Sequence, residues 1–235
     1  MRITVVTYNV RGFRDGVDRV AEVVERLAPD VLLLQESGSR RTLRRFAADL
    51  GLDVARDPWS PLRRRVKDAV LARPPWRIVD HRQHRFAGSA RFYPRGALIA
   101  QVGRAGRRVW AISTHLGLTP TERNAHVHEL TDLSTGLAGG PVVLGGDLNA
   151  TPEERAVRWL ADRYRDVWTT VGEAGGSGET GRADAGATFP ARDPPARIDF
   201  LFASAGLRVV SARVAAHAGE ASDHLPVAAD LQVED

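Results

Sequence analysis

The stretch Gly145-Gly146-Asp147-Leu148-Asn149 follows a short apolar run, residues 142–144, which is typical of a buried strand. The two glycines let the backbone turn tightly after that strand, and they leave Asp147 and Asn149 two residues apart. If the segment stays extended, both side chains lie on one face. The alternative is an Asx-type turn, in which a polar side chain bonds to the nearby backbone. A carboxylate and an amide at a strand end suit metal or phosphate chemistry, so this stretch is the first candidate for a catalytic site.

Strand-like and helix-like patterns alternate on both sides of this stretch. Strands are expected at residues 3–8, 31–35, 68–72, 76–81, 97–102, 109–114, 142–144, 198–203, 207–216 and 226–233. Helices are expected near residues 17–27 and 43–50, and after two capping boxes with proline, at 119–122 and 151–154. The glycine-rich segment 172–186 is expected to be a surface loop. Because strands and helices interleave without a clear boundary, the sequence predicts one layered α/β domain over residues 1–235.

The composition restricts the chemistry available to the chain. There are no cysteines among the 235 residues, which excludes disulfides, thiolate nucleophiles, Cys-ligated zinc and iron–sulfur clusters. Any catalytic metal must therefore sit on oxygen and imidazole ligands. The net charge is +4, and 32 of the 33 basic residues are arginine, with Lys67 the single lysine. This excess is compatible with weak attraction to phosphates, and equally with a general preference for arginine over lysine.

The chain carries no pattern that directs it to a membrane. No apolar run approaches the roughly 18 residues needed to cross a bilayer. The N-terminus, Met1-Arg2-Ile3-Thr4-Val5-Val6-Thr7-Tyr8-Asn9, is too short and too polar for the core of a signal peptide. We expect a cytoplasmic protein with no membrane partner, and no obligate protein partner is evident.

Polar groups suited to metal or phosphate chemistry stand at or near one end of six expected strands. They are Asn9, Glu36, His115, Asp147 with Asn149, Asp199, and Asp223 with His224. Side chains at strand ends can converge on one cleft while the sheet holds them rigid. Each also has a plain alternative: Glu36 as a solvated acid, Asn9 as a turn residue, and Asp223-His224 as a polar turn.

Six short motifs, in this order, resemble the endonuclease/exonuclease/phosphatase superfamily, which includes the deoxyribonuclease I-like phosphoesterases. They are Thr7-Tyr8-Asn9, Leu34-Gln35-Glu36, Ser113-Thr114-His115-Leu116, Gly145-Gly146-Asp147-Leu148-Asn149, Arg197-Ile198-Asp199-Phe200 and Ser222-Asp223-His224-Leu225-Pro226. The resemblance runs over about residues 4–227. It implies a four-layered α/β sandwich, in which helices flank two packed, mostly antiparallel or mixed β-sheets. It also implies hydrolysis of phosphoesters with Mg²⁺ or Mn²⁺.

The resemblance implies a metal site with oxygen ligands, as hard divalent ions prefer. Glu36 is the expected direct ligand, supported by Asn9 and Asp223. Asp147 is an alternative ligand for a second metal ion.

The resemblance also implies catalytic roles. Asp147 and Asn149 position or activate water and stabilise the pentacovalent phosphate. Asp199 orients His224, which acts as general base or phosphate contact. His115 donates a hydrogen bond or a proton to the phosphate or the leaving oxygen.

Three further residues are candidates for substrate binding. Asp68 stands where many relatives carry asparagine, so it either contacts the phosphate or orients His115, unless it is a plain surface aspartate. Arg95 is placed to reach the substrate phosphate. Arg40 belongs to a basic helical cluster with Arg41, Arg44 and Arg45, which either grips a nucleic-acid backbone or forms a solvated face.

The sequence favours a metal-dependent phosphoesterase that hydrolyses phosphodiester bonds, with nucleic acid among the expected substrates. A small-molecule, inositol or lipid phosphate phosphatase on the same fold is the alternative. A non-catalytic binding module is disfavoured because every main motif is filled. A membrane-directed lipid phosphodiesterase needs an exposed aromatic or apolar insertion, and none is visible in a chain with 6% aromatic residues.

Overall fold

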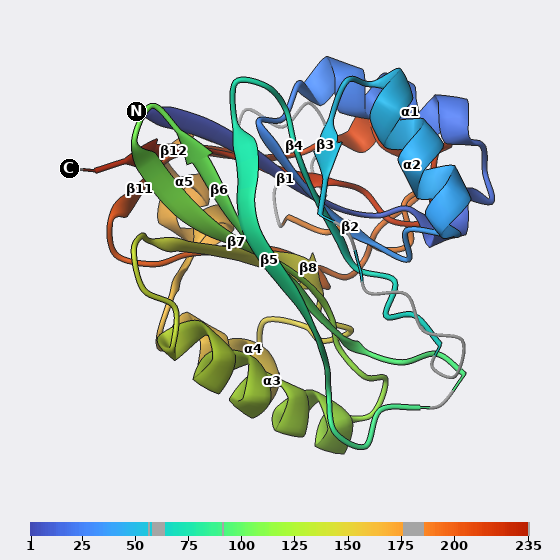
Figure 1. Ribbon diagram of the computed structural model, residues 1–235. Coiled ribbons are helices and arrows are strands. Elements are labelled where there is room, and N and C mark those ends of the chain that lie inside the picture. Colours follow the sequence, from blue (N-terminus) through green and yellow to red (C-terminus); the bar gives the residue numbers. More distant parts are fainter. Residues whose placement is uncertain (56, 58–63, 91, 176–185, 235) are drawn as a thin grey trace.

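The apolar strands form two six-stranded sheets that pack face to face, as the computed structural model shows for residues 1–55, 57, 64–90, 92–175 and 186–234 (Figure 1). The first sheet has the order β11 (Leu207–Val214), β12 (Val227–Val233), β1 (Arg2–Asn9), β2 (Val31–Gln35), β4 (Ala69–Ala72), β3 (Asp53–Val54). The second has the order β5 (Arg77–Arg85), β6 (Gly96–Arg104), β7 (Arg107–His115), β8 (Val142–Asp147), β10 (Asp199–Ala203), β9 (Arg165–Asp166).

Helices cover the outer faces of both sheets, α1 and α2 on the first and α3 and α4 on the second (Figure 1). The helices are α1 (Val17–Leu27), α2 (Arg40–Asp49), α3 (Pro120–Thr135), α4 (Arg155–Ala161) and α5 (Val167–Gly175), with short 3₁₀ turns at Arg11–Phe13 and Ala216–Ala218. None of the described helices is long and apolar enough to span a bilayer.

Alternation along β1 explains why it is apolar on both faces. Ile3 and Val5 point into the core between the sheets, while Val6 and Tyr8 pack under the first pair of helices. A strand buried on both sides has no solvated face, so it reads as an almost continuous apolar run. The resulting layers, helix–sheet–sheet–helix, confirm the predicted four-layered sandwich.

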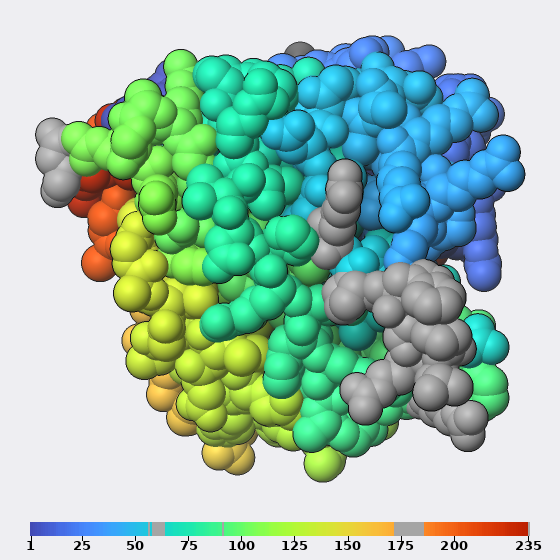
Figure 2. Space-filling view, viewed as in Figure 1, coloured from blue at the N-terminus to red at the C-terminus, as the bar shows by residue number. Residues whose placement is uncertain are grey.

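The space-filling view shows strand β5 on the surface between α2 and α3 (Figure 2). This strand lies at the edge of its sheet, and most of its residues are exposed or half-buried. Its second half carries four arginine and histidine residues, His81, Arg82, His84 and Arg85. Charged side chains on an edge strand discourage pairing with another chain.

The strand register brings many strand ends to one edge of the molecule. Parallel strands β1 and β2 end together, as do β7 and β8. Their antiparallel neighbours β12, β4, β6 and β10 begin at that same edge. A buried contact ties the two sheets there: Gln35 Nε2 donates to Ser113 Oγ at 3.0 Å, and Ser113 Oγ donates to the carbonyl of Leu34 at 2.9 Å.

The sequence predicted a tight turn at Gly145 and Gly146. The structure instead places both residues inside β8. A Cβ at Gly146 would collide with the carbonyl oxygen of Thr114 on β7, and one at Gly145 would lie 2.5 Å from Leu201 Cδ2. The pair is needed for close packing of neighbouring strands.

Two other local predictions need correction. The capping box at Thr119 is present at the start of α3, but the one predicted at Thr151 is not, since α4 begins only at Arg155 with Glu154 as its N-cap. The first four residues of the expected loop 172–186 complete α5. Residues 176–185 lie outside the described part of the chain.

Candidate active site

Nearly all the predicted site residues lie at the shared edge of the two sheets. Asn9, His115 and Asp147 are the last residues of β1, β7 and β8, and Asp199 is the first of β10. Asp68 and Arg95 immediately precede β4 and β6, and Glu36 immediately follows β2. Strands fix the backbone of each, so the side chains are held in position without a bound ligand.

The Asp147 carboxylate is the centre of the buried part of the site. Its Oδ2 accepts a hydrogen bond from Asn9 Nδ2 at 2.9 Å and lies 3.1 Å from His115 Nε2. His224 Nε2 lies 3.7 Å from the same oxygen. Asp147 and these three neighbours, which come from both sheets, are each no more than 6% exposed.

His224 forms a second pair within this cluster. Its Nδ1 lies 2.8 Å from Asp199 Oδ2, and its ring packs against Phe189 with centroids 4.7 Å apart. An imidazole fixed on one nitrogen by a carboxylate presents its other nitrogen in a defined direction. The predicted orientation of His224 by Asp199 therefore matches the observed contact.

The charges in this cluster reinforce one another. Burial lowers the pKa of His224, but the carboxylates of Asp199, Asp147 and Asp223 outweigh it and raise that pKa to about 9. Burial raises the pKa of Asp147, but the imidazoles of His115 and His224 and the hydrogen bond from Asn9 bring it well below the usual range. Burial also raises the pKa of Asp199, against the opposing effect of His224. We assign the proton of the Asp199–His224 pair to His224, because three carboxylates favour the imidazolium.

Asn149 departs from the extended conformation considered for it. Its φ is +49°, its backbone N–H donates to Asp147 Oδ1 at 2.9 Å, and its Nδ2 donates to the carbonyl of Leu116 at 3.1 Å. The Asx-type contact and the polar site occur together, because the turn orients the Asp147 carboxylate.

A small cavity of about 100 Å³ opens beside the buried cluster, and Glu36, Asp68, Arg95 and His115 line it. Arg95 Nη1 lies 2.6 Å from Nδ1 of His115. The Asp68 carboxylate is 1% exposed, and neither of its oxygens has a hydrogen-bond partner. Asp68 therefore faces the cleft as predicted, but it does not orient His115 through a hydrogen bond; Arg95 and Asp147 hold that ring.

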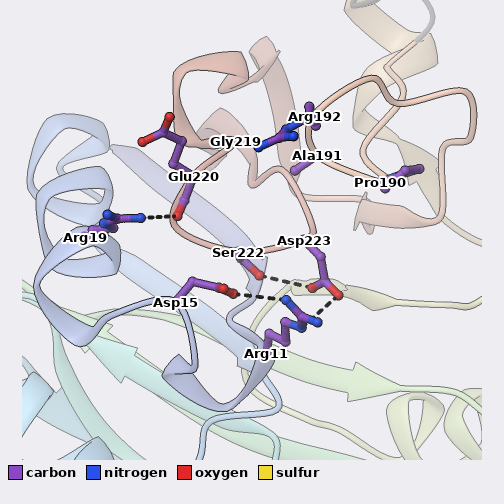
Figure 3. Close-up of a pocket in the computed structure, with 10 residues that line it drawn as sticks. All are labelled: Arg11, Asp15, Arg19, Pro190, Ala191, Arg192, Gly219, Glu220, Ser222 and Asp223. Carbon is purple, nitrogen blue, oxygen red and sulfur yellow. Dashed lines mark hydrogen bonds and ion pairs between the residues drawn. The ribbon is translucent and has the colours of Figure 1, made fainter.

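Asp223 lies on the other side of Arg11. Arg11 Nε lies 3.2 Å from Asp223 Oδ2, and Arg11 also reaches Asp15 (Figure 3). These residues line a pocket of about 490 Å³ that Glu36 does not line. Glu36 and Asp223 thus line separate pockets, and Arg11 lines both. The Asn9 amide contacts the backbone of Arg11, with its Oδ1 accepting from the Arg11 N–H at 3.0 Å.

The unpaired carboxylates fit a divalent cation. Burial raises the pKa of Asp68 well above its usual value; Arg95 and Arg65 oppose this, while the charges of Asp147 and Glu36 add to it. A cation in the cavity would relieve that repulsion and leave positions for water and phosphate. Deeper in the site, ligand atoms of Asp147, Asp199 and His224 lie within 4.8 Å of one another and could also hold a metal ion. Those atoms already bond to protein partners, whereas both oxygens of the Asp68 carboxylate are buried without a hydrogen-bond partner among the described residues.

Arg40 contacts Asp57, which lies outside the buried cluster. Its Nη2 lies 2.6 Å from Asp57 Oδ2, and it lines a groove that adjoins the small cavity. The sequence analysis did not identify Arg11, although this residue comes two positions after Asn9 and begins the 3₁₀ turn that follows β1. It also did not identify Phe189, because no pattern in the sequence predicts that its ring contacts His224.

Comparison with known proteins was made on both sequence and structure. The Endonuclease/Exonuclease/phosphatase family matches residues 6–224 of the chain. No curated protein sequence gives a match. An endonuclease/exonuclease/phosphatase from Bacteroides vulgatus has a similar structure, with a TM-score of 0.82 and 20% identity over 100% of both chains.

Two solved structures of other proteins are also similar. The human Nocturnin catalytic domain with bound sulfate gives a TM-score of 0.72 at 20% identity, covering 98% of this chain and 94% of that one. A mannosyl-6-phosphatase from Bacteroides thetaiotaomicron gives 0.76 at 18% identity, covering 98% of this chain and 99% of that one. At such identities the likeness shows a shared fold.

Proposed function

The chain belongs to the Endonuclease/Exonuclease/phosphatase family, and we propose that it is a nuclease or phosphodiesterase that hydrolyses phosphodiester bonds with Mg²⁺ or Mn²⁺. Family membership and the buried Asp/His cluster make it a hydrolase of phosphoesters. The single observation that supports the proposed chemistry best is the convergence of Asn9, His115 and His224 on one oxygen of Asp147.

In the proposed reaction, the protein orients water on one side of the phosphorus and stabilises charge on the other. Asp147 stays ionised at neutral pH, because its neighbours keep its pKa low, and it orients the attacking water with Asn149. His224 is an imidazolium at neutral pH, because its pKa is raised to about 9. This favours a role in contacting the phosphate oxygens, with Asp199 holding the ring.

His115 and Arg95 are proposed to stabilise negative charge on the phosphate and on the leaving oxygen. His115 donates to the phosphate or the leaving oxygen, and Arg95, which contacts its ring, neutralises phosphate charge in the same cavity. Glu36 and Asp68, which both line this cavity, would hold the metal, and Asn9 and Asp223 are the further ligands that we propose. When bound, a divalent ion supplies Lewis-acid stabilisation of the charge that develops on phosphate oxygens.

The substrate class follows from the surroundings of the site. Proteins of the same fold include a mannosyl-6-phosphatase, so the fold itself admits small monoesters. We favour a diester because two larger pockets adjoin the small cavity. One, of about 490 Å³, shares Arg11 with it, and the other, of about 610 Å³, shares Arg14, Lys67, Phe92 and Tyr93. A diester has a substituent on each side of the phosphorus, whereas a monoester needs only one such space.

A screen with Mg²⁺ or Mn²⁺ tests the proposal. The substrates are plasmid DNA, single-stranded DNA, RNA, bis-p-nitrophenyl phosphate, inositol phosphates and a sugar phosphate. We expect hydrolysis of diesters, lost in EDTA and restored by metal, with polymer cleavage falling steeply as salt rises. Hydrolysis of monoesters alone would replace this proposal with a small-molecule phosphatase.

A further inference from the structure

A second, larger groove continues from the small catalytic cavity. It has a volume of about 610 Å³. The side chains that matter here are Arg14, Arg40, Arg64, Lys67, Phe92 and Tyr93. Arg14, Lys67, Phe92 and Tyr93 also line the catalytic cavity. A molecule lying in the groove can therefore extend to His115 and Glu36 without crossing a barrier.

The groove is cationic along its whole described lining. None of the described residues that line it is acidic, and Arg14, Arg64 and Lys67 are exposed. Arg40 and Arg65 both pair with Asp57, Arg65 Nε at 2.9 Å, and Arg65 also donates to the carbonyl of Gly38 at 2.8 Å. These two arginines build the wall, while the three exposed cations remain available to phosphates.

Two neighbouring aromatic rings stand in the same groove. Phe92 is 64% exposed and Tyr93 70% exposed, and they are the aromatic members of the four large hydrophobic side chains that are exposed in the described chain. The guanidinium carbon of Arg64 lies 5.2 Å from the centroid of the Phe92 ring. Leaving two large rings in water is unfavourable unless a ligand covers them, and flat rings between cations suit a base stacked between two phosphates.

We propose that this groove binds single-stranded nucleic acid, with unstacked bases against Phe92 and Tyr93 and the backbone phosphates at Arg14, Arg64 and Lys67. The inference rests on the proposed phosphodiesterase function and specifies its substrate. In a duplex the bases are already stacked on one another, so their faces are not available to protein rings. A sugar phosphate or an inositol phosphate has no aromatic face to place there.

Binding without metal tests the proposal independently of catalysis. Labelled single strands of DNA and of RNA, and the duplex of the same sequence, are titrated in EDTA and followed by fluorescence anisotropy. We expect the single strands to bind more tightly than the duplex. Because stacking contributes about 1–3 kcal/mol per base, the Phe92→Ala/Tyr93→Ala variant should bind single strands at least about tenfold more weakly. Val79→Ala, at an exposed apolar residue on β5, is the matched control. Tighter duplex binding, or unchanged single-strand binding by the double variant, would overturn the proposal.

The single lysine provides a direct footprint. Lys67 and the N-terminal amine of Met1 are the two amines of the chain, and the N-terminus bonds to the carbonyl of Val233 at 3.0 Å. Acetylation followed by mass spectrometry should show Lys67 protected at saturating oligonucleotide, with Met1 modified at the same rate as before. Equal acetylation of Lys67 with and without bound oligonucleotide would contradict the assigned path.

Salt dependence tests the phosphate contacts. Each phosphate contact to a single strand contributes about 0.7 to the slope of log K against log salt, so Arg14→Ala and Lys67→Ala should each reduce the slope by about that amount. Arg208→Ala, at an exposed residue of β11, should leave it unchanged. If the parent protein does not bind oligonucleotides but still hydrolyses bis-p-nitrophenyl phosphate, the groove proposal alone is refuted. If the parent protein binds oligonucleotides but hydrolyses no diester, the proposed function alone is refuted.

Discussion

The buried cluster around Asp147 and the groove around Phe92 lie side by side but are built in opposite ways. The cluster side chains are at most 6% exposed and bond to one another across two sheets. The two groove rings are more than 60% exposed and stand in a loop before β6. Under the proposed function, chemistry and substrate binding are thus assigned to separate structures, one fixed by strands and one presented by loops.

The physical reason for this division is the cost of misplacement. Burying a carboxylate is costly unless it is paired, and the contacts that pair Asp147 are also those that position it for its proposed role. An exposed cation or ring gains little from fixed geometry and binds a flexible chain better when it can adjust. Changes in the cluster should therefore alter turnover, whereas changes in the groove should alter affinity and salt dependence.

The largest effect is expected from Asp147→Asn. Asparagine is uncharged and has a single acceptor oxygen, so it cannot serve both the Asn9, His115 and His224 contacts of Oδ2 and the Asn149 N–H at Oδ1. We expect kcat to fall at least about a hundredfold, as is typical of positioned acid–base groups. Steady-state kinetics on a diester, with circular dichroism to check the fold, measures this. Asp53→Asn, which breaks an exposed pair with Arg77, is the matched control. Near-normal turnover in folded Asp147→Asn would refute the assignment.

His224→Ala should also reduce kcat at least about a hundredfold. The imidazolium that contacts the phosphate is lost while Asp199 remains. The factor by which His224→Ala lowers kcat should change little with salt concentration, because the buried charge of the parent His224 is poorly screened. If KM and the salt slope change while kcat does not, His224 belongs to the binding region and the comparison fails.

The raised pKa of His224 also predicts a pH dependence of stability. A group whose folded pKa is about 9, against about 6.5 when unfolded, stabilises the folded chain fully below pH 6.5. This contribution is lost as the pH rises through about 9. Urea unfolding of the parent and of His224→Gln, without added divalent metal, should show the difference between them shrinking over this range. A constant difference would mean that the ring does not titrate there.

Asp68→Asn should raise stability in the absence of metal. Its raised pKa means that the carboxyl stabilises the fold only when protonated, and that contribution is lost as pH rises through the folded pKa. The stability of the variant relative to the parent should therefore rise with pH, because asparagine does not titrate. The variant should also lose part of the stabilisation that Mg²⁺ gives the parent. Thermal unfolding with and without Mg²⁺ measures both; equal stabilisation by Mg²⁺ would exclude Asp68 from the cation site.

The smallest effect is expected from Arg40→Ala. This arginine pairs with Asp57 at the wall of the groove and is 26% exposed in its side chain, so solvent partly screens its charge. KM for an oligonucleotide should rise less than about threefold, with kcat unchanged. A larger rise than that of Lys67→Ala would move the phosphate path toward α2.

The sequence alone could predict that the candidate site residues meet at one edge, because they stand at strand ends. Asn9, His115 and Asp147 each follow an apolar run, and a sheet brings such ends together whatever the loops do. Strands β3 and β9 are only two residues long and have no periodicity that could reveal them.

The pairing of Arg11 with Asp223 could not be predicted in the same way. It joins the loop after β1 to the loop before β12, and such a contact depends on loop geometry. Phe92 and Tyr93 likewise stand outside any strand or helix, so only the structure brings them beside Lys67 and the cavity.

The most direct test of the division between chemistry and binding is a specificity ratio. It compares kcat/KM for a single-stranded oligonucleotide with kcat/KM for bis-p-nitrophenyl phosphate, in the parent, Asp147→Asn and Phe92→Ala/Tyr93→Ala. We predict that Asp147→Asn lowers both values by the same factor and keeps the ratio constant. The groove variant should lower the ratio at least about tenfold. An unchanged ratio in the groove variant, or a changed one in Asp147→Asn, would contradict the account.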